Sequence, residues 1–159
     1  YMVEGQTAKQ FYKLKGLMYQ HPLVMHKLLR HMTKQICNTL QAQIDAGVDA
    51  IMLFDTWGGI VTDQLFKEFS LQYIAEIVHT LKQTNPEVPV IVFCKNGGRC
   101  LTDIAATGCN AVGLDWAVNL AVARAAVGHQ VALQGNMDPC TLYADPERII
   151  LEVKSNFIF

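Results

Sequence analysis

Four groups of polar residues follow short apolar runs in this chain, and each group could bind a polar ligand. The groups are Asp55-Thr56, Lys95-Asn96, Asp115 and Gln134-Asn136-Asp138. A hydroxyl such as that of Thr56 can donate a hydrogen bond that orients a carboxylate. The Lys95 ammonium, ahead of Gly97-Gly98, could hold an anion at the start of the next helix. The residue types therefore fit a polar ligand, and a polyanionic one is not excluded.

Each of these residues also has a structural interpretation, which the sequence alone leaves open. Thr56 could cap the turn that follows it, and Lys95 could be packed for structure alone. We expect Asp55 and Asp115 to accept hydrogen bonds from loop N–H groups rather than to touch a substrate. The other polar residues are expected to organise their loop, and the two tryptophans to pack around the same edge: Gln134, Asn136, Asp138, Trp57 and Trp116.

The cysteines and histidines form no metal-binding pattern. The five cysteines are odd in number and contain no C-x-x-C pair, so we expect reduced thiols, as in a cytoplasmic protein. Cys94 and Cys100 would need a nearby histidine to bind zinc, and none lies close in the sequence. The histidines at 21, 26 and 31 are not spaced to share one helix face, and we expect them at the surface or at an interface. No metal site is predicted.

Hydrophobic periodicity predicts four strands that alternate with helices. A long helix begins near Pro22, has apolar residues at steps of three and four, and stops at Gly47. Strands are expected at 50–54, 88–93, 111–114 and 130–133. Further helices are expected at 65–81, 99–107, 119–127 and from Asp145 onward. The segment 1–16 is weakly patterned.

The four predicted strands are short, continuously apolar and rich in Val, Ile and Leu. Strands of this kind are buried on both faces, which indicates a parallel sheet with helices outside. An open sheet and part of a (β/α)8 barrel both fit, and neither G-x-G-x-x-G nor G-x-x-x-x-G-K-[ST] occurs. An open sheet binds its ligand at one switch point, whereas a barrel gathers polar residues from many strand ends. The four polar strand ends favour an α/β fold that is a partial (β/α)8 TIM barrel of about four βα units.

Length and composition set the bounds of this prediction. With 159 residues, 51% of them apolar, the chain can bury a core, and disorder is excluded. A net charge of −1 gives no basic surplus for nucleic acid, and no apolar run is long enough to span a membrane. A complete barrel needs eight strands and typically about 250 residues. We therefore expect residues 1–159 to be an interior fragment of a single barrel domain in a larger enzyme.

Four motifs of the chain resemble the uroporphyrinogen decarboxylase family, in the family's order and spacing. They are Tyr1-Met-Val-Glu-Gly5, Phe54-Asp-Thr-Trp-Gly-Gly59, Gly113-Leu-Asp-Trp116 and Leu133-Gln-Gly-Asn-Met-Asp-Pro139. The resemblance covers essentially the whole chain, and the Trp57 form is similar to bacterial members. It implies a barrel of which this chain is about strands four to seven. Two substrate-binding positions of the family fall on Tyr1 and Thr56.

The resemblance also implies the activity of a cytoplasmic, homodimeric enzyme of haem and tetrapyrrole biosynthesis. The implied reaction removes carbon dioxide from the four acetate side chains of uroporphyrinogen III, without metal or cofactor, and yields coproporphyrinogen III. The family's arginine-rich segment, its catalytic aspartate and the histidine of its Gly-His-Gly stretch have no counterpart here. No catalytic residue is therefore predicted within the chain, and the fragment alone is expected to be inactive.

Two other functions remain open at this point. A zinc-dependent cobalamin- or thiol-linked methyltransferase of the same barrel superfamily would place His and Cys ligands at strand ends, and the corresponding Phe93-Cys94-Lys95 contains no His-x-Cys. A non-catalytic binding or oligomerisation module is the second alternative, and no sequence feature favours it.

Overall fold

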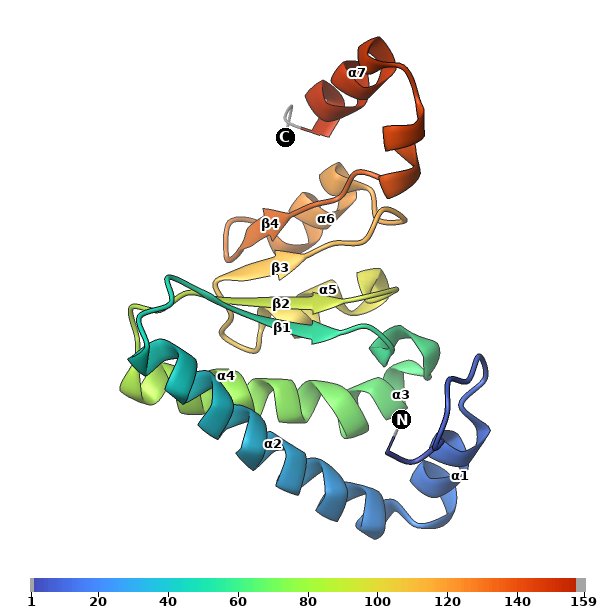
Figure 1. Ribbon diagram of the computed structural model, residues 1–159, viewed down its shortest axis with the longest axis vertical. Helices are drawn as coiled ribbons and strands as arrows, with labels where there is room; N and C mark the ends of the chain where they lie inside the picture. The colour runs from blue at the N-terminus through green and yellow to red at the C-terminus, as the bar shows by residue number, and fades with distance from the viewer. Residues whose placement is uncertain (1, 157–159) are drawn as a thin grey trace.

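The computed structural model describes residues 2–156, which form one parallel sheet with helices packed on one of its faces (Figure 1). The strands are β1 (Ile51–Asp55), β2 (Val90–Cys94), β3 (Ala111–Gly113) and β4 (Ala132–Gln134), hydrogen-bonded in the order β1-β2-β3-β4. The helices are α1 (Tyr12–Gln20), α2 (Pro22–Asp45), α3 (Asp63–Phe66), α4 (Gln72–Thr84), α5 (Leu101–Ala105), α6 (Leu120–Val127) and α7 (Pro146–Asn156).

Four short helical turns complete the fold. Three are 3₁₀ turns: η1 (Gly58–Ile60), η3 (Gly98–Cys100) and η4 (Pro139–Tyr143). The fourth is a π-helical turn, η2 (Lys67–Leu71), which joins α3 to α4. Thr62 begins this long helical stretch, because its hydroxyl accepts a hydrogen bond from the Leu65 N–H at 3.3 Å.

The outer face of the sheet carries the main core. Val90, Val92 and Val112 are almost completely buried there, against α4, α5 and α6. Full burial of one such side chain contributes roughly 1.5–3 kcal/mol. A second cluster joins α2 and α4 to β1 through Leu40, Ile51, Ile77 and Leu81. The strand positions, and so their ends, are fixed by these contacts with the helices behind them.

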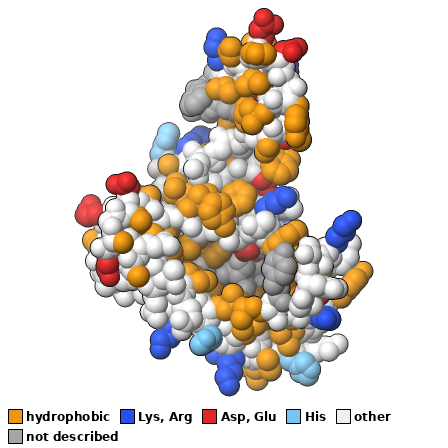
Figure 2. All heavy atoms as spheres, viewed as in Figure 1, with side chains coloured by type: hydrophobic (Ala, Val, Ile, Leu, Met, Phe, Trp, Pro, Cys, Tyr) orange, Lys and Arg blue, Asp and Glu red, His pale blue; other side chains and the backbone are white. Residues whose placement is uncertain are grey.

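In the view of Figure 1, the inner face of the sheet lies toward the viewer and is largely open. The paired strands place Phe54, Phe93, Gly113 and Gln134 in one row across this face. The Phe54 ring is 67% exposed, and its centroid lies 5.8 Å from that of Phe93. Figure 2 shows hydrophobic side chains gathered over the strands in this view. Phe54 and Phe93 therefore give one end of this row an apolar, aromatic surface that is accessible from the open side.

The predicted fold class is confirmed, because the four strands form a parallel sheet with helices outside, as in part of a (β/α)8 barrel. The strands lie within one or two residues of the predicted ranges, and α2 spans Pro22–Asp45. The helix expected at 99–107 is shorter, because its first residues form the turn η3. Helix α1 was not predicted. Within residues 2–156 no helix has both the length and the apolar character for a membrane span.

Candidate functional site

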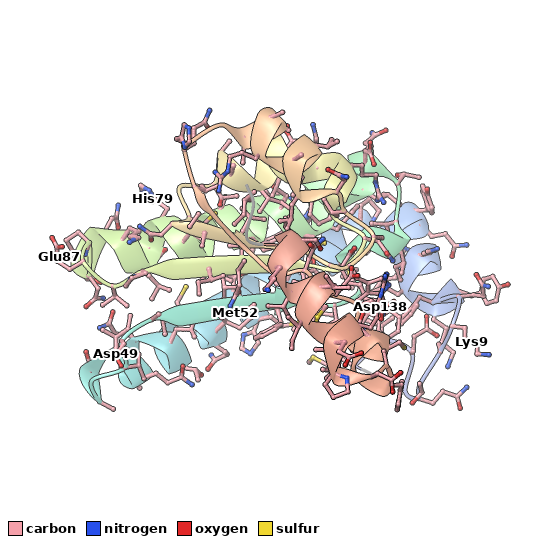
Figure 3. The ribbon with its side chains drawn as sticks, turned by 90° about the horizontal axis from the view of Figure 1, so that it is seen from above. Lys9, Asp49, Met52, His79, Glu87 and Asp138 are labelled. Carbon is pink, nitrogen blue, oxygen red and sulfur yellow. The ribbon has the colours of Figure 1, made fainter. Side chains whose placement is uncertain are left out.

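The polar residues predicted from the sequence lie at the carboxyl ends of the four strands or just beyond them, at one end of the sheet. In Figure 3, Asp49 and Glu87, which precede β1 and β2, lie at the opposite end from Asp138, which follows β4. Two residues beyond the row of Phe54, Phe93, Gly113 and Gln134 come Thr56, Lys95, Asp115 and Asn136. We call these four residues the rim. The Lys95 N–H donates to the Asp55 carbonyl at 3.3 Å, which extends the β1–β2 pairing to this level.

Asp115 joins the loops that follow β2 and β3. Its side chain is buried, with 4% exposure, and its carboxylate accepts hydrogen bonds from the backbone N–H groups of Asn96 and of Ala117, the latter at 2.9 Å. The Asn136 amide then donates to the Asp115 carbonyl at 2.8 Å and to that of Val118. The structural roles predicted for Asp115 and Asn136 are confirmed.

The loop after β4 is organised in the same way. The Asp138 carboxylate accepts the Cys140 N–H at 2.9 Å, as predicted for a loop-organising residue. The Gln134 carbonyl accepts the Leu114 N–H at 2.8 Å, while the Gln134 side chain is exposed. The backbone of this loop is therefore tied to β3 as well as to itself.

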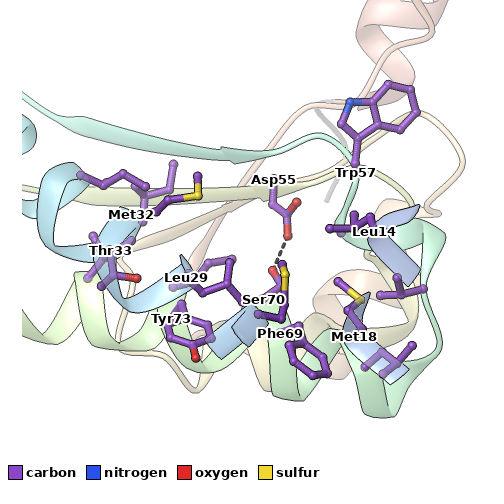
Figure 4. Close-up of a pocket in the computed structure, with 18 of the residues that line it drawn as sticks. Leu14, Met18, Leu29, Met32, Thr33, Asp55, Trp57, Phe69, Ser70 and Tyr73 are labelled. Carbon is purple, nitrogen blue, oxygen red and sulfur yellow. Dashed lines mark hydrogen bonds between the residues drawn. The ribbon is translucent and has the colours of Figure 1, made fainter. Parts of the chain in front are cut away.

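Asp55 differs from the prediction. Its carboxylate accepts a hydrogen bond from the Ser70 hydroxyl in η2, not from a loop N–H group (Figure 4). The prediction was wrong because the π-helical turn, which no local pattern indicated, turns Ser70 toward the end of β1. Asp55 therefore fixes the β1 end to the outer helical layer.

The ends of β1 and β2 are also held against each other. A Cβ atom added at Gly59 would overlap the Lys95 carbonyl oxygen, so the two loops touch through backbone atoms. The Arg99 guanidinium bridges the same loops, since it donates to the carbonyls of Gly59 at 3.2 Å and Asn96 at 3.3 Å and pairs with Asp63. The rim thus has a backbone fixed by contacts on several sides.

Of the two substrate-binding residues implied by the resemblance, Thr56 and Tyr1, the structure describes only Thr56. Thr56 is exposed at the rim, and in residues 2–156 no hydrogen bond joins its hydroxyl to another residue. Tyr1 lies outside the described residues. Glu4 of the same motif is joined to α1, since its carboxylate accepts the Leu14 N–H at 2.9 Å, and Phe11, which precedes α1, contacts Trp57 with ring centroids 5.0 Å apart.

The rim also carries a lysine and two partly exposed tryptophans. The Lys95 ammonium lies 5.2 Å from the centroid of the Trp116 ring, within the range of a cation–π interaction. Trp116 and Trp57 are each about half exposed, at 50% and 49%. Trp57 contacts Phe11, as expected for a tryptophan that packs at this edge, whereas the ring contact of Trp116 is with the Lys95 ammonium.

Burial shifts the thiols of Cys94, Cys100 and Cys109 toward their protonated form. Burial, and to a smaller extent the nearby Asp55 carboxylate, raise the pKa of Cys94 to about 12. Burial likewise raises the pKa of Cys100 and of Cys109. Residues 2–156 contain no grouping of three His, Cys, Asp or Glu side chains that could hold a metal ion.

A cavity of about 300 Å³ lies between β1, α2 and α4 (Figure 4). Apolar side chains such as Leu29, Met32 and Phe69 line most of it. Asp55 and Ser70, which also line it, already bond to each other. This cavity therefore offers few free polar groups, and the rim is the better site for an anionic ligand.

Sequence reasoning missed one polar cluster beside this cavity. His26 Nδ1 lies 2.7 Å from the Tyr73 hydroxyl, His26 Nε2 lies 3.3 Å from a Glu68 carboxylate oxygen, and the His26 ring stacks on Phe69. These contacts leave the His26 side chain 17% exposed, so only a small part of it reaches the surface; the sequence predicts a position at the surface or at an interface. The partners lie more than 40 residues away in the sequence, so no local signal pointed to them.

Comparisons with known proteins give one consistent result. Residues 1–157 match the model of the family described as uroporphyrinogen decarboxylase (URO-D). The chain is 54% identical over 156 residues to a uroporphyrinogen decarboxylase of Actinobacillus pleuropneumoniae serotype 5b, covering 97% of this chain and 44% of that protein. Proteins of the same name from Mannheimia succiniciproducens and Vibrio cholerae are also 54% identical, over 157 residues. The chain thus spans less than half the length of the curated relatives it matches, and the methyltransferase alternative gains no support.

Proposed function

The chain belongs to the uroporphyrinogen decarboxylase family, and from this we propose that it supplies part of the active site of a decarboxylase acting on uroporphyrinogen III. The reaction removes carbon dioxide from the four acetate side chains and yields coproporphyrinogen III. The enzyme is then a carboxy-lyase that works without a cofactor. Residues 1–159 would form one part of a single barrel domain.

The chemistry of the substrate explains why such an enzyme can do without a cofactor. Loss of carbon dioxide from an acetate on a pyrrole leaves the electron pair of the broken C–C bond on the methylene carbon. If the ring carbon is protonated first, the resulting cation accepts that pair, so the ring serves as the electron sink that other enzymes obtain from a cofactor. The methylene carbon becomes a methyl group once it gains a proton and the ring gives up the proton it took. The protein then has to stabilise the cation and hold the carboxylates, which is electrostatic work.

The observation that carries the proposal is the position of Thr56. Its exposed hydroxyl stands at the rim, one step beyond the aromatic inner row that contains Phe54 and Phe93. An apolar surface next to a hydrogen-bond donor suits a tetrapyrrole, whose rings are apolar and whose side chains end in carboxylates. Thr56 and Tyr1 would each donate a hydrogen bond to such a carboxylate.

The remaining parts of the proposal concern the whole protein. We place no catalytic residue within residues 1–159, since the family's aspartate and histidine have no counterpart here. The complete protein would act as a homodimer in the cytoplasm. Its substrate would be the polyanionic uroporphyrinogen III, with no nucleic acid or membrane partner.

The test uses a full-length chain. In the Actinobacillus pleuropneumoniae relative, the matching segment is replaced by residues 1–159, which gives a protein that we call the exchanged enzyme. We expect it to consume uroporphyrinogen III and to form coproporphyrinogen III, whereas the 159-residue chain alone forms none. An exchanged enzyme that melts cooperatively but releases no carbon dioxide would overturn the proposal.

Substitutions at the rim sharpen the test. In the exchanged enzyme, Thr56→Val removes the hydroxyl and keeps the shape, and we expect KM to rise roughly 5- to 10-fold, as for the loss of one hydrogen bond to a charged group. Thr56→Ser keeps the donor and serves as the matched control. A Thr56→Val enzyme with unchanged KM would contradict the role of this hydroxyl.

A further inference from the structure

Lys95 and Thr56 are the two rim residues whose side chains are not used to organise the loops. Asp115 and Asn136, by contrast, are bound to the backbone of neighbouring loops. In the part of the chain that the structure describes, no hydrogen bond or ion pair joins the Lys95 ammonium to another residue. The ammonium therefore keeps its three N–H donors available.

The charge of Lys95 is not neutralised by its acidic neighbours. The Asp55 carboxylate is bound to Ser70, on the side of the helices, and the Asp115 carboxylate is bound to two backbone N–H groups. Arg99, the other cation of this loop, shows the contrast. Its guanidinium pairs with Asp63 and donates to three backbone carbonyls, so it is fully engaged in holding the loops together.

The position of Lys95 is nevertheless fixed. Its backbone N–H is bonded to Asp55, and its carbonyl lies against Gly59, where no side chain could fit. The ammonium rests 5.2 Å from the Trp116 ring centroid. An aromatic face attracts a cation without neutralising it, so this contact orients the ammonium and leaves it able to bind an anion.

We propose that Lys95 is a substrate-binding residue that forms an ion pair with one carboxylate of the tetrapyrrole at the rim. This inference rests on the proposed function, because it takes the ligand to be a polycarboxylate. The carboxylate is not the one that leaves. An ion pair with the departing carboxylate would stabilise the substrate and be lost as carbon dioxide forms, which would raise the barrier. Lys95 therefore contributes to binding of substrate and transition state alike.

The test compares charge removal at two places in the exchanged enzyme. Lys95→Met removes the ammonium and keeps an unbranched chain beside Trp116, and Lys95→Arg keeps the charge. Lys67→Met is the matched control, because Lys67 pairs with Asp103 at 2.9 Å, away from the rim. We expect Lys95→Met to raise KM for uroporphyrinogen III about 10-fold or more with kcat changed by less than about 2-fold. Lys95→Arg should restore most of the loss.

Salt gives an independent measurement. Ionic screening weakens an ion pair with the substrate, so KM of the unsubstituted exchanged enzyme should rise with salt more steeply than KM of Lys95→Met. Should Lys95→Met fail to fold, Lys95→Gln carries the same comparison. An unchanged KM for the charge-removed variant, or a fall in kcat alone, overturns the role of Lys95 while the proposed function stands. An inactive unsubstituted exchanged enzyme overturns both.

Discussion

Asp55 is the last residue of β1 and Asp115 lies two residues beyond β3 in the same sheet, yet their carboxylates are bound to different layers of the molecule. Asp55 accepts a hydrogen bond from the Ser70 side chain in the helical layer outside the sheet. Asp115 accepts hydrogen bonds from the backbone N–H groups of Asn96 and Ala117, in the loops around it. The first carboxylate ties a strand end outward, and the second ties loops to one another.

The two carboxylates therefore have different structural roles at the same end of the sheet. The region around Asp115 defines the shape of the loops, and its buried carboxylate has no alternative partner in water. The region around Asp55 defines where the first strand end stands relative to the helices, and its carboxylate is only half buried. We therefore expect substitutions in the Asp115 region to cost more stability than those in the Asp55 region.

The largest effect is expected for Asp115→Ala. Two backbone N–H groups would lose their acceptor in a buried place, which should cost about 2–4 kcal/mol and most of the decarboxylase activity of the exchanged enzyme. Asp138→Ala is the matched control, because Asp138 also accepts one backbone N–H but is exposed, and about 0.5–1 kcal/mol is expected. Urea denaturation measures both. Equal losses of stability in the two variants would mean that the buried Asp115 carboxylate stabilises the protein no more than the exposed Asp138 carboxylate does.

The next effect concerns the contact between the β1 and β2 loops. Gly59→Ala places a Cβ on the Lys95 carbonyl, and the loops have to separate, at a cost of roughly 1–3 kcal/mol. Gly16→Ala is the control, because Gly16 lies inside α1 with open space around it, where alanine should stabilise the helix by about 0.5–1 kcal/mol. Melting temperatures of the two variants should move in opposite directions. A shift of the same sign in both would show that the loops are not in tight contact.

The contrast between the two carboxylates also explains what the sequence could predict. The roles of Asp115 and Asn136 followed from residue type and position, because Asp and Asn at a strand end bond nearby backbone groups. The strands and α2 followed from local hydrophobic periodicity. The Asp55–Ser70 bond could not be predicted, since it depends on the π-helical turn at 67–71, which adds one residue to a turn and changes which side chains face β1.

Helix α1 was missed for a similar reason. Its apolar pattern is weak, and it begins after Phe11, which has a positive φ of 54°. Its position depends on contacts between residues distant in the sequence: Met18 packs against Leu65 and Phe69, and the Glu4 carboxylate caps the N–H of Leu14. Such contacts exist only once α3 and η2 have formed, so no local signal could reveal them.

A smaller effect is expected for Ser70→Ala, which removes the partner of the Asp55 carboxylate. Because this carboxylate is half buried and can bind water instead, we expect a loss of about 1 kcal/mol. The control is Ser155→Ala, whose hydroxyl donates to the Glu152 carbonyl on the exposed α7 and which should change stability by less than about 0.5 kcal/mol. If Ser70→Ala and Ser155→Ala lower the free energy of unfolding equally, the hydrogen bond between Asp55 and Ser70 contributes nothing to stability.

Titration of the Cys94 thiol, at the end of β2, has the smallest effect on stability at neutral pH and a distinct one at high pH. Burial raises the pKa of Cys94 from 9.0 to about 12, so the unfolded chain loses this proton before the folded one does. The contribution to stability is therefore complete below pH 9.0 and is lost as the pH rises toward about 12.

We expect the urea midpoint of the exchanged enzyme to fall between pH 8 and pH 11 more steeply than that of Cys94→Ala. Groups common to both proteins cancel in this difference, and Cys140→Ala, which removes an exposed thiol, should leave the slope unchanged. If the urea midpoints of Cys94→Ala and of the unsubstituted enzyme fall equally steeply with pH, the Cys94 thiol is not shielded from water.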